Sequence, residues 1–319
     1  SRGAAPGLDG WTRELLLPIV HDKEGLCELT RMLSDILNGI TSEQTIARLL
    51  GCPLFPLAKD EVGGVRPIAI ESTLMKVLSH VALARVSEDT WAKAFPHLQF
   101  GAGPKANLET AIHTVRERIE RGQHAILVDC KNAFNTISRE TIMEQLKKNP
   151  GFWPLYRLAS WSLRPTPLSV LQEGKCVAKI LSASGVRQGS VLGPLLFCLA
   201  IQPTLQRISS TCPNVQVAAY LDDITITSDN ASDANTAFHA LEQELSKIGL
   251  SVNRRKTVAL VPSDTITPTD IQSTQSVTRL LGAAIWLKHS GPQEVADFVV
   301  NQMKRHDVFF ERIAGSGLS

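Results

Sequence analysis

Two strand-forming runs flank a pair of adjacent acids, and this pattern leaves few choices for the local fold. Val215 to Leu221 is an apolar run, Asp222 and Asp223 follow it, and residues 224–227 alternate apolar and polar side chains. Such runs on both sides of a short polar segment predict a β-hairpin. The two acids are therefore expected at the turn of a hairpin.

Asp129 is a third acid in a similar setting, because it follows an apolar run at 125–128 that is typical of a buried strand. Mg²⁺ favours carboxylate oxygens and substrate phosphates, and converging strand-end acids can hold the metal pair used in phosphoryl transfer. Adjacent strand residues point to opposite faces, so we expect Asp222 to ligate directly. Asp223 would assist electrostatically or ligate through distortion of the turn. The alternative is that the two acids bind no metal and are present only because Asp is a common turn residue.

The order of predicted elements indicates a split β-α-β unit. A strand, a helix, the hairpin, a second helix and a last strand are predicted, in this order, at 125–129, 190–208, 215–227, 232–248 and 257–261. This order places Asp129 beside Asp222. Ser232 is expected to cap the second helix and Gly249 to end it. Residues 138–188 interrupt the unit and are expected to pack in a second lobe.

The preceding part of the chain predicts helices and one further pair of strands. Residues 53–70 have the pattern of two strands around a polar turn at 59–64, and residues 71–90 that of a buried helix. Residues 108–121 predict a helix with one apolar face, formed by Ile112, Val115 and Ile119.

Composition limits the class of protein. The net charge is +2, so a nucleic-acid surface must be local. The six cysteines have no metal-binding spacing, which favours reduced thiols in an intracellular protein. No apolar run is long enough to span a bilayer, and no signal peptide is visible, so no membrane partner is expected. The chain begins at Ser1 without Met, and we expect it to be a piece of a longer protein.

Seven segments, in order, resemble the motifs of reverse transcriptases. These are Gly7–Trp11 (an N-terminal motif of non-LTR retrotransposon enzymes), Lys59 with Arg66–Ile68 (fingers), Val128–Phe134 (motif A), Gly185–Pro194 (motif B), Tyr220–Asp223 (motif C), Gly249–Asn253 with Lys256 and Thr257 (motif D), and Leu280–Gly282 (motif E, the primer grip). One such motif alone is weak evidence for the family, but six or seven of them in order, at plausible spacing, are very specific. Motif B most resembles non-LTR elements that insert at fixed genomic sites. Two residues depart from the family pattern: Leu221 stands where Ala is usual and Asn135 where Asp is usual.

The resemblance implies an α+β fold, a right-hand polymerase with fingers, a split β-α-β palm and a partial or absent thumb. The implied regions are fingers with an N-terminal extension at 1–121, palm with motif A at 122–137, a fingers insertion at 138–188, palm with motifs B to E at 189–285, and the start of a thumb or connector at 286–319.

The resemblance also implies a metal site. Asp129 and Asp222 would hold two Mg²⁺ ions, for which Mn²⁺ could substitute, and the backbone carbonyl of Cys130 would add an oxygen ligand. Asp223 would act beside them in catalysis. Lys256 would protonate the pyrophosphate leaving group, unless it is only a solvated loop lysine.

Further residues are implied to bind the nucleotide and the primer. Lys59 and Arg66 would clamp the triphosphate, or else be plain surface charges. Phe134 would close the sugar pocket below the 2′ position, or serve core packing alone. Gln188 would line the nucleotide or template site, and Gly189 would permit close backbone approach. The primer grip would comprise Leu280, Leu281 and Gly282.

The implied activity is RNA-directed DNA synthesis by a retroelement enzyme that adds dNTPs to a primer on an RNA or DNA template, in the nucleus or the cytoplasm. Two alternatives stay open: another palm-type polymerase, intron-encoded or viral, and a domesticated nucleic-acid-binding scaffold without catalysis. A non-catalytic scaffold would be expected to have lost the acids that bind metal. Asp129, Asp222 and Asp223 are all present, which argues against this alternative. The oligomeric state is not predicted.

Overall fold

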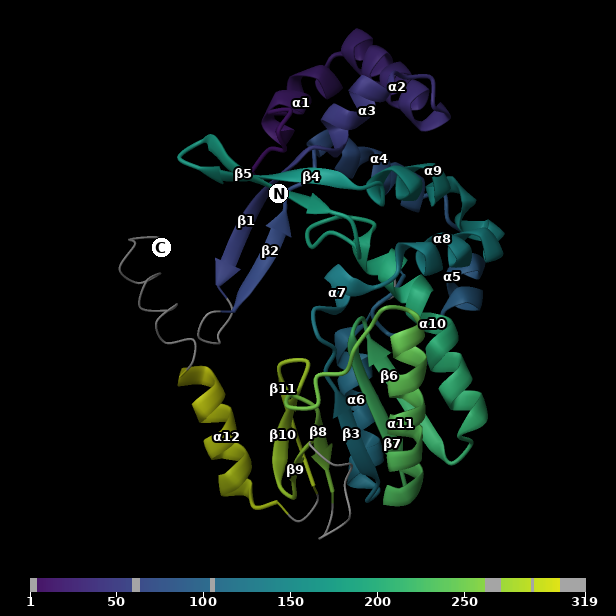
Figure 1. The fold of residues 1–319 in the computed structure, drawn as a ribbon, viewed down its shortest axis with the longest axis vertical. Helices are drawn as coiled ribbons and strands as arrows, with labels where there is room; N and C mark the ends of the chain where they lie inside the picture. The colour runs from purple at the N-terminus through teal and green to yellow at the C-terminus, as the bar shows by residue number, and fades with distance from the viewer. Residues whose placement is uncertain (1–4, 59–63, 104–106, 262–270, 288–289, 305–319) are drawn as a thin grey trace. The chain divides into compact units, whose positions relative to one another are not determined.

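A computed structural model describes residues 5–58, 64–103, 107–261, 271–287 and 290–304 (Figure 1). The chain forms two compact units, each built from separate segments. Unit 1 comprises Ser1–Pro96, Asn132–Pro203 and Ile248–Leu250. Unit 2 comprises His97–Lys131, Thr204–Lys247 and Ser251–Ser319. The 138–188 insertion thus belongs to the same unit as the N-terminal segment.

Unit 1 is rich in helices, and several of them begin at a polar side chain that caps the first turn. The helices are α1 (Arg13–His21), α2 (Lys23–Asn38), α3 (Glu43–Leu50), α4 (Thr73–Leu83), α5 (Glu88–Ala94), α7 (Ala133–Thr136), α8 (Arg139–Lys148), the 3-10 helix η1 (Pro150–Phe152) and α9 (Trp153–Ser162). The single helix predicted over 71–90 is wrong in extent. The Ser87 side chain accepts a hydrogen bond from the Thr90 N–H, so a second helix starts there.

Unit 1 also holds a four-stranded sheet of order β2-β1-β4-β5. Its strands are β1 (Cys52–Ala58), β2 (Val65–Ala69), β4 (Thr166–Gln172) and β5 (Lys175–Ser182). The β1 and β2 strands form the predicted antiparallel pair, with Leu57 opposite Arg66. Much of β5 is exposed, so this sheet contributes less to the core than the sheet of unit 2.

Unit 2 is organised by a five-stranded sheet of order β6-β7-β3-β8-β9. The strands are β3 (His124–Val128), β6 (Val215–Tyr220), β7 (Asp223–Ser228), β8 (Val258–Leu260) and β9 (Gln272–Thr274). Strand β3 pairs antiparallel with both β7 and β8. The predicted split β-α-β order is therefore confirmed, and β9 is an addition to it.

The helices of this arrangement are α6 (Leu108–Glu120), α10 (Gly193–Thr211) and α11 (Ala231–Lys247). The boundary between the two units falls within α10, at Pro203. The prediction that Ser232 caps α11 is wrong, because Ser232 lies inside the helix. Its N–H donates to Asn230 Oδ1, so Asn230 supplies the polar group at this end. Gly249 lies just beyond α11 with a φ of 82°, in keeping with its predicted role.

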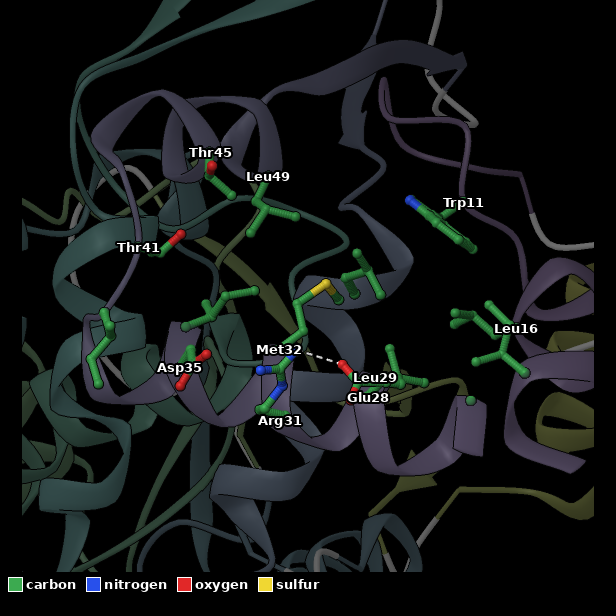
Figure 2. Close-up of a pocket in the computed structure, with 15 residues that line it drawn as sticks. Trp11, Leu16, Glu28, Leu29, Arg31, Met32, Asp35, Thr41, Thr45 and Leu49 are labelled. Carbon is green, nitrogen blue, oxygen red and sulfur yellow. Dashed lines mark hydrogen bonds and ion pairs between the residues drawn. The ribbon is translucent and has the colours of Figure 1, made fainter. Parts of the chain in front are cut away.

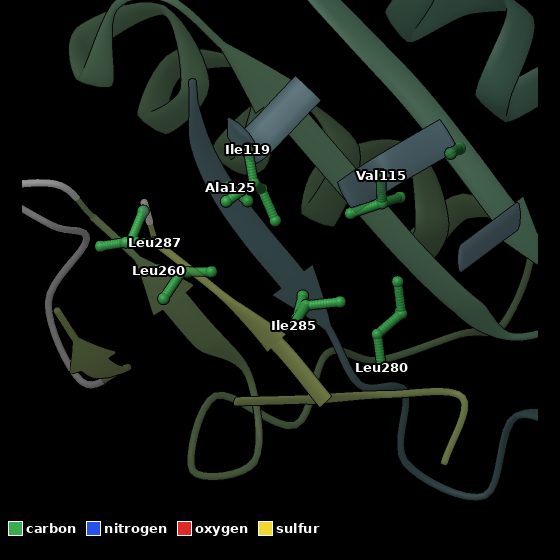
Figure 3. Close-up of a cluster of buried hydrophobic side chains, with 8 residues drawn as sticks. Val115, Ile119, Ala125, Leu260, Leu280, Ile285 and Leu287 are labelled. Carbon is green, nitrogen blue, oxygen red and sulfur yellow. The ribbon is translucent and has the colours of Figure 1, made fainter. Parts of the chain in front are cut away.

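A buried cluster joins α6 to the sheet and to a C-terminal hairpin (Figure 3). The hairpin consists of β10 (Val277–Leu280) and β11 (Ala283–Trp286), and α12 (Pro292–Lys304) follows it. The cluster residues are Val115, Ile119, Ala125, Ala218, Leu260, Leu280, Ile285 and Leu287. Burial of each large side chain contributes about 1.5–3 kcal/mol, so the hairpin is firmly attached to this core. Among the described residues, every helix is too short or too polar to cross a lipid bilayer.

Candidate active site

The hairpin of β6 and β7 carries Asp222 in a two-residue turn. Tyr220 pairs with Asp223, so Leu221 and Asp222 form the connection. Leu221 has a φ of 56°, while Asp222 is not among the residues with positive φ. A positive φ at the first central residue alone is the pattern of a type II′ turn. The prediction of acids at the turn is confirmed for Asp222, whereas Asp223 is the first residue of β7.

Asp129 immediately follows β3, the strand next to this hairpin. Val128 pairs with Ile224 across the antiparallel ladder of β3 and β7. Continuing this register by one residue brings Asp129 beside Asp223. The sheet of unit 2 therefore gathers the three predicted acids at one end.

The electrostatics of unit 2 show that these carboxylates act on one another. Burial, and then the charges of Asp222 and Asp129, raise the pKa of Asp223 to about 6, and Arg279 opposes the shift. Burial and the same three carboxylates raise the pKa of the Cys130 thiol to about 12. Asp223 is also partly accessible to water, although protein atoms surround its carboxylate, so water screens part of the repulsion. Clustered like charges of this kind are stabilised by a cation.

The acids fit a metal whose coordination is completed by substrate. Within the part of the chain that is described, no group of three or more His, Cys, Asp or Glu side chains is arranged to hold a metal ion. Mg²⁺, however, is usually bound by one or two carboxylates together with substrate phosphates and water. Two of the acids at this end of the sheet would satisfy that requirement.

The Cys130 carbonyl takes no part in the hydrogen bonds of the neighbouring strand bridge. Cys130 forms an isolated antiparallel bridge with Val252. The bridge is made by the Asn253 N–H donating to the Asp129 carbonyl at 2.7 Å and the Lys131 N–H donating to the Ser251 carbonyl at 2.8 Å. Neither bond uses the Cys130 carbonyl, which therefore stays compatible with its predicted role.

The motif D segment supports Asp129 from the neighbouring loop. The Asp129 N–H donates to Thr257 Oγ1 at 3.3 Å, and Thr257 is fully buried. The Lys256 N–H donates to the Asn253 carbonyl at 3.0 Å, while its side chain is exposed. Lys256 therefore lies in the loop that holds the Asp129 backbone, and its general-acid role stays a prediction.

The residues predicted to bind the nucleotide belong to unit 1. Arg66 is exposed on β2. Phe134 is half-buried and stacks on Phe197, with ring centroids 4.8 Å apart and planes inclined by 2°. Lys59 lies outside the described residues. The ring of Phe134 thus has a packing partner, and its predicted contact with the sugar is an additional role to be tested.

Motif B is bonded to motif A and to β2 within unit 1. The Val186 N–H donates to the Phe134 carbonyl at 2.6 Å, and the Ala69 N–H donates to the Gln188 carbonyl at 2.8 Å. Gly189 has a φ of 105°, and a Cβ there would lie 2.4 Å from the Ala69 carbonyl oxygen. The backbone at Gly189 therefore closely approaches β2, and its role at the nucleotide site stays a prediction.

Two arginines near these motifs were not predicted. The Arg139 guanidinium donates five hydrogen bonds to groups of Leu163, Ser182, Ser184 and Gly185, which fix the start of motif B. Burial, and then Arg187, lower the pKa of Arg139 to about 10. Arg279, from β10, is a cation that acts on Asp223 in unit 2. No local sequence pattern marks either residue, because their partners are distant in the chain.

The predicted primer-grip residues form the turn between β10 and β11. Leu280 pairs with Ala283, and Leu281 and Gly282 have φ values of 51° and 89°. Two consecutive positive φ values are typical of a type I′ hairpin turn. Leu280 is buried in the cluster of Figure 3, so the turn is fixed to the core, while its contact with a primer stays a prediction.

A separate hollow of about 730 Å³ lies among α1, α2 and α3 of unit 1 (Figure 2). Its lining is mainly apolar and includes Trp11, Leu16, Met32 and Leu49. It contains none of the residues predicted to bind metal or nucleotide. Trp11 belongs to the N-terminal motif, so this motif is built into the packing of the helical part of unit 1.

Comparison with known proteins decides the family. The family model for reverse transcriptase (RNA-dependent DNA polymerase) matches residues 57–285. The chain belongs to the reverse transcriptase family. This match covers β2, β4 and β5 of unit 1, the three acids, and β10 with most of β11.

The similar curated proteins are products of retrotransposable elements. A SLACS 132 kDa protein of Trypanosoma brucei gambiense is 38% identical over 261 residues, covering 82% of this chain and 22% of that protein. A type-1 retrotransposable element R2 Pol polyprotein of Nasonia vitripennis is 26% identical over 213 residues, covering 62% of this chain and 20% of that protein. The reverse transcriptase chain therefore spans about a fifth of the length of these relatives. The predicted likeness to non-LTR retrotransposon enzymes is confirmed.

Among solved structures, an apo telomerase from Candida tropicalis has a similar fold. The TM-score is 0.56 at 12% identity, over 86% of this chain and 52% of that one. This likeness confirms the predicted α+β right-hand polymerase fold. The boundaries predicted for fingers, palm and thumb stay predictions.

Proposed function

We propose that this chain is the polymerase part of a retroelement protein and that it performs RNA-directed DNA synthesis. It would extend a primer 3′-hydroxyl with dNTPs on an RNA or DNA template. The observation that carries the proposal is the gathering of Asp129, Asp222 and Asp223 at one end of the unit 2 sheet. Membership of the reverse transcriptase family supports nucleotide addition as the chemistry of this acidic cluster.

Asp129 and Asp222 would hold two Mg²⁺ ions, with the Cys130 carbonyl as a further oxygen ligand. Bound Mg²⁺ would neutralise triphosphate charge and lower the barrier to attack by the primer hydroxyl. Asp223, whose pKa is raised by burial and by the neighbouring acids, would add negative charge that strengthens cation binding. Lys256 would deliver a proton to the pyrophosphate as it leaves.

Unit 1 would supply the nucleotide contacts. Lys59 and Arg66 would bind the triphosphate, Arg66 through its planar fork of donors. Phe134 and Gln188 would border the sugar and base, while Gly189 would keep motif B close to β2. Template and primer would be held mostly through their phosphates, because the enzyme must accept every sequence. The nucleus and the cytoplasm are the expected sites of action.

The test is primer extension on RNA and DNA templates with dNTPs while Mg²⁺ is titrated. Wild type should extend on RNA only when metal is present, and Asp222→Asn should lower kcat by at least about 100-fold. Asp233→Asn is a matched control in the same unit, since Asp233 lies in the first turn of α11, and it should retain activity.

The other outcomes separate the alternatives. Extension on DNA but never on RNA would indicate another palm-type polymerase. Binding of template and primer without extension at any metal concentration would indicate a scaffold. Equal activity in Asp222→Asn and wild type would refute the assignment of the metal site.

A further inference from the structure

The segment before α6 lies against the first strand of the β6–β7 hairpin in unit 2. The Phe100 N–H donates to the Ala219 carbonyl at 2.7 Å, and the Ala219 N–H donates to the Leu98 carbonyl at 2.7 Å. Gln99 therefore forms a parallel bridge with Ala219, two residues before the turn. Only 4% of Gln99 is exposed, so its polar side chain must find partners within the protein.

The Gln99 side chain finds those partners in the turn itself. Its Oε1 accepts hydrogen bonds from the N–H groups of Leu221 at 2.8 Å and Gly101 at 2.9 Å. Its Nε2 donates to the Leu221 carbonyl at 3.1 Å. One buried amide thus binds both the N–H and the carbonyl of a single turn residue.

Leu221 is the residue of the turn that needs such support. Its φ of 56° lies in the left-handed region, where the Cβ of a non-glycine residue is crowded. A conformation of this kind persists only when surrounding contacts impose it. Asp222 follows directly, so the backbone of Leu221 determines where the Asp222 carboxylate points.

The neighbouring Gly101 permits the contact. A Cβ built at Gly101 would lie 2.7 Å from the Leu221 nitrogen and 3.0 Å from Gln99 Oε1. Gly101 is not among the glycines with positive φ, so space and not backbone conformation limits this position. The close approach of residues 99–101 to the turn therefore needs a residue without a side chain.

We propose that Gln99 is a positioning residue that holds Leu221 in its left-handed conformation and thereby orients Asp222 for nucleotide addition. This inference rests on the proposed function, in which Asp222 binds the metal. Gln99 itself touches neither substrate nor metal in this scheme. It acts through the peptide groups on each side of Leu221.

Gln99→Met is the informative substitution, because Met has a similar size but cannot make the three hydrogen bonds. Misplacement of a reacting group by about 1 Å can cost about 100-fold in rate. We therefore expect kcat to fall by roughly 10- to 100-fold, with the KM for dNTP changed by less than about threefold. A higher Mg²⁺ concentration should be needed for half-maximal rate.

Gln123→Met is the matched control. Gln123 is also buried in unit 2, and its Nε2 donates to Asp229 Oδ1 at 3.1 Å, beyond the opposite ends of β3 and β7. If Gln99 only stabilises the fold, both variants should lose thermal stability and keep similar kcat and Mg²⁺ requirements. That result would overturn the inference.

Leu221→Gly provides a second test, because glycine adopts positive φ without steric cost. The loss of kcat caused by Gln99→Met should be at least about fivefold smaller in the Leu221→Gly background, since coupled residues are not additive. Equal losses in the two backgrounds would show that Gln99 does not act through the conformation of Leu221.

Amide hydrogen exchange tests the anchor, that is, the hydrogen bonds between the Gln99 side chain and the Leu221 backbone, independently of activity. The Leu221 N–H should exchange at least about tenfold faster in Gln99→Met than in wild type, while the Ile226 N–H, in the middle of β7, should be unchanged. Unchanged protection at Leu221 would refute the anchor. Inactive wild type with the expected change in exchange would refute the proposed function and leave the anchor established.

Discussion

Replacing Phe134 with Val separates the predicted sugar contact from ordinary packing. The ring is half-buried and lies flat on Phe197, which is fully buried. A stacked aromatic pair contributes about 0.5–1.5 kcal/mol beyond its buried area. Removing part of the apolar ring costs about 1–2 kcal/mol more, because only part of it is buried. We expect Phe134→Val to destabilise the protein by about 2–3 kcal/mol.

The predicted function of Phe134 adds a kinetic consequence. A rigid ring below the 2′ position would leave a ribose hydroxyl without space and without a hydrogen-bond partner, and both effects penalise rNTP. Loss of the ring should therefore raise kcat/KM for rNTP relative to dNTP by at least about 100-fold, which corresponds to about 2.7 kcal/mol. Single-nucleotide extension with each substrate measures this ratio.

Phe95→Val is the control for packing. Phe95 is a half-buried phenylalanine of unit 1 whose ring contacts Trp91 and Phe152. This variant should lose comparable stability and keep the discrimination of wild type. If Phe134→Val also keeps that discrimination, or if wild type already uses rNTP efficiently, Phe134 is a packing residue only.

Two further predictions concern stability. Gly189→Ala should destabilise the protein by about 2–4 kcal/mol in urea unfolding, because a Cβ would meet the Ala69 carbonyl oxygen at 2.4 Å in addition to the strain at φ 105°. Gly174→Ala is its control, since Gly174 has a φ of 76° and open space, and equal losses would refute the contact. A hydrogen bond from Arg254 is the main cause that lowers the pKa of Glu242. The stabilisation that this Glu242–Arg254 hydrogen bond contributes is therefore fully present above the unfolded-state pKa of about 4.5. It is lost as pH falls through the lower folded-state pKa of Glu242. The Glu242–Arg254 pair is partly exposed, so Glu242→Gln should cost less than about 1 kcal/mol at pH 7. A stability difference that does not shrink as pH falls below 4.5 would contradict this account.

The sequence predicts the elements of the unit 2 sheet well because their patterns are local. Apolar spacing along α6 and α11 marks the faces that are buried, and the strand order follows from the order of elements in the chain. Element ends are less predictable. Serine is a common N-cap residue, but the helix begins earlier than Ser232. Asparagine is equally suited to the N-cap, and Asn230 Oδ1 accepts a hydrogen bond from the Ser232 N–H.

The hydrogen bonds that hold the site's backbone could not be predicted, because they join residues that are distant in the sequence. Gln99 and Leu221 are 122 positions apart, and Arg139 reaches groups up to 46 positions away. Neither residue type marks such a role, since glutamine and arginine are common on surfaces. Only the folded chain shows that both are directed at backbone groups beside the motifs.

Leu221 departs from the family pattern without changing the backbone strain of the turn. Leu stands where Ala is usual, yet both residues carry a Cβ, so the cost of about 1–2 kcal/mol for the left-handed conformation is common to both. The substitution therefore leaves the backbone strain of the turn unchanged and alters packing alone. The Leu221 Cγ would lie 2.9 Å from a Cβ at Gly101, so the larger side chain occupies the space that Gly101 leaves. An apolar residue with a Cβ is strained at this turn, and Gln99 stabilises it through hydrogen bonds to the backbone, which do not depend on the side chain at position 221.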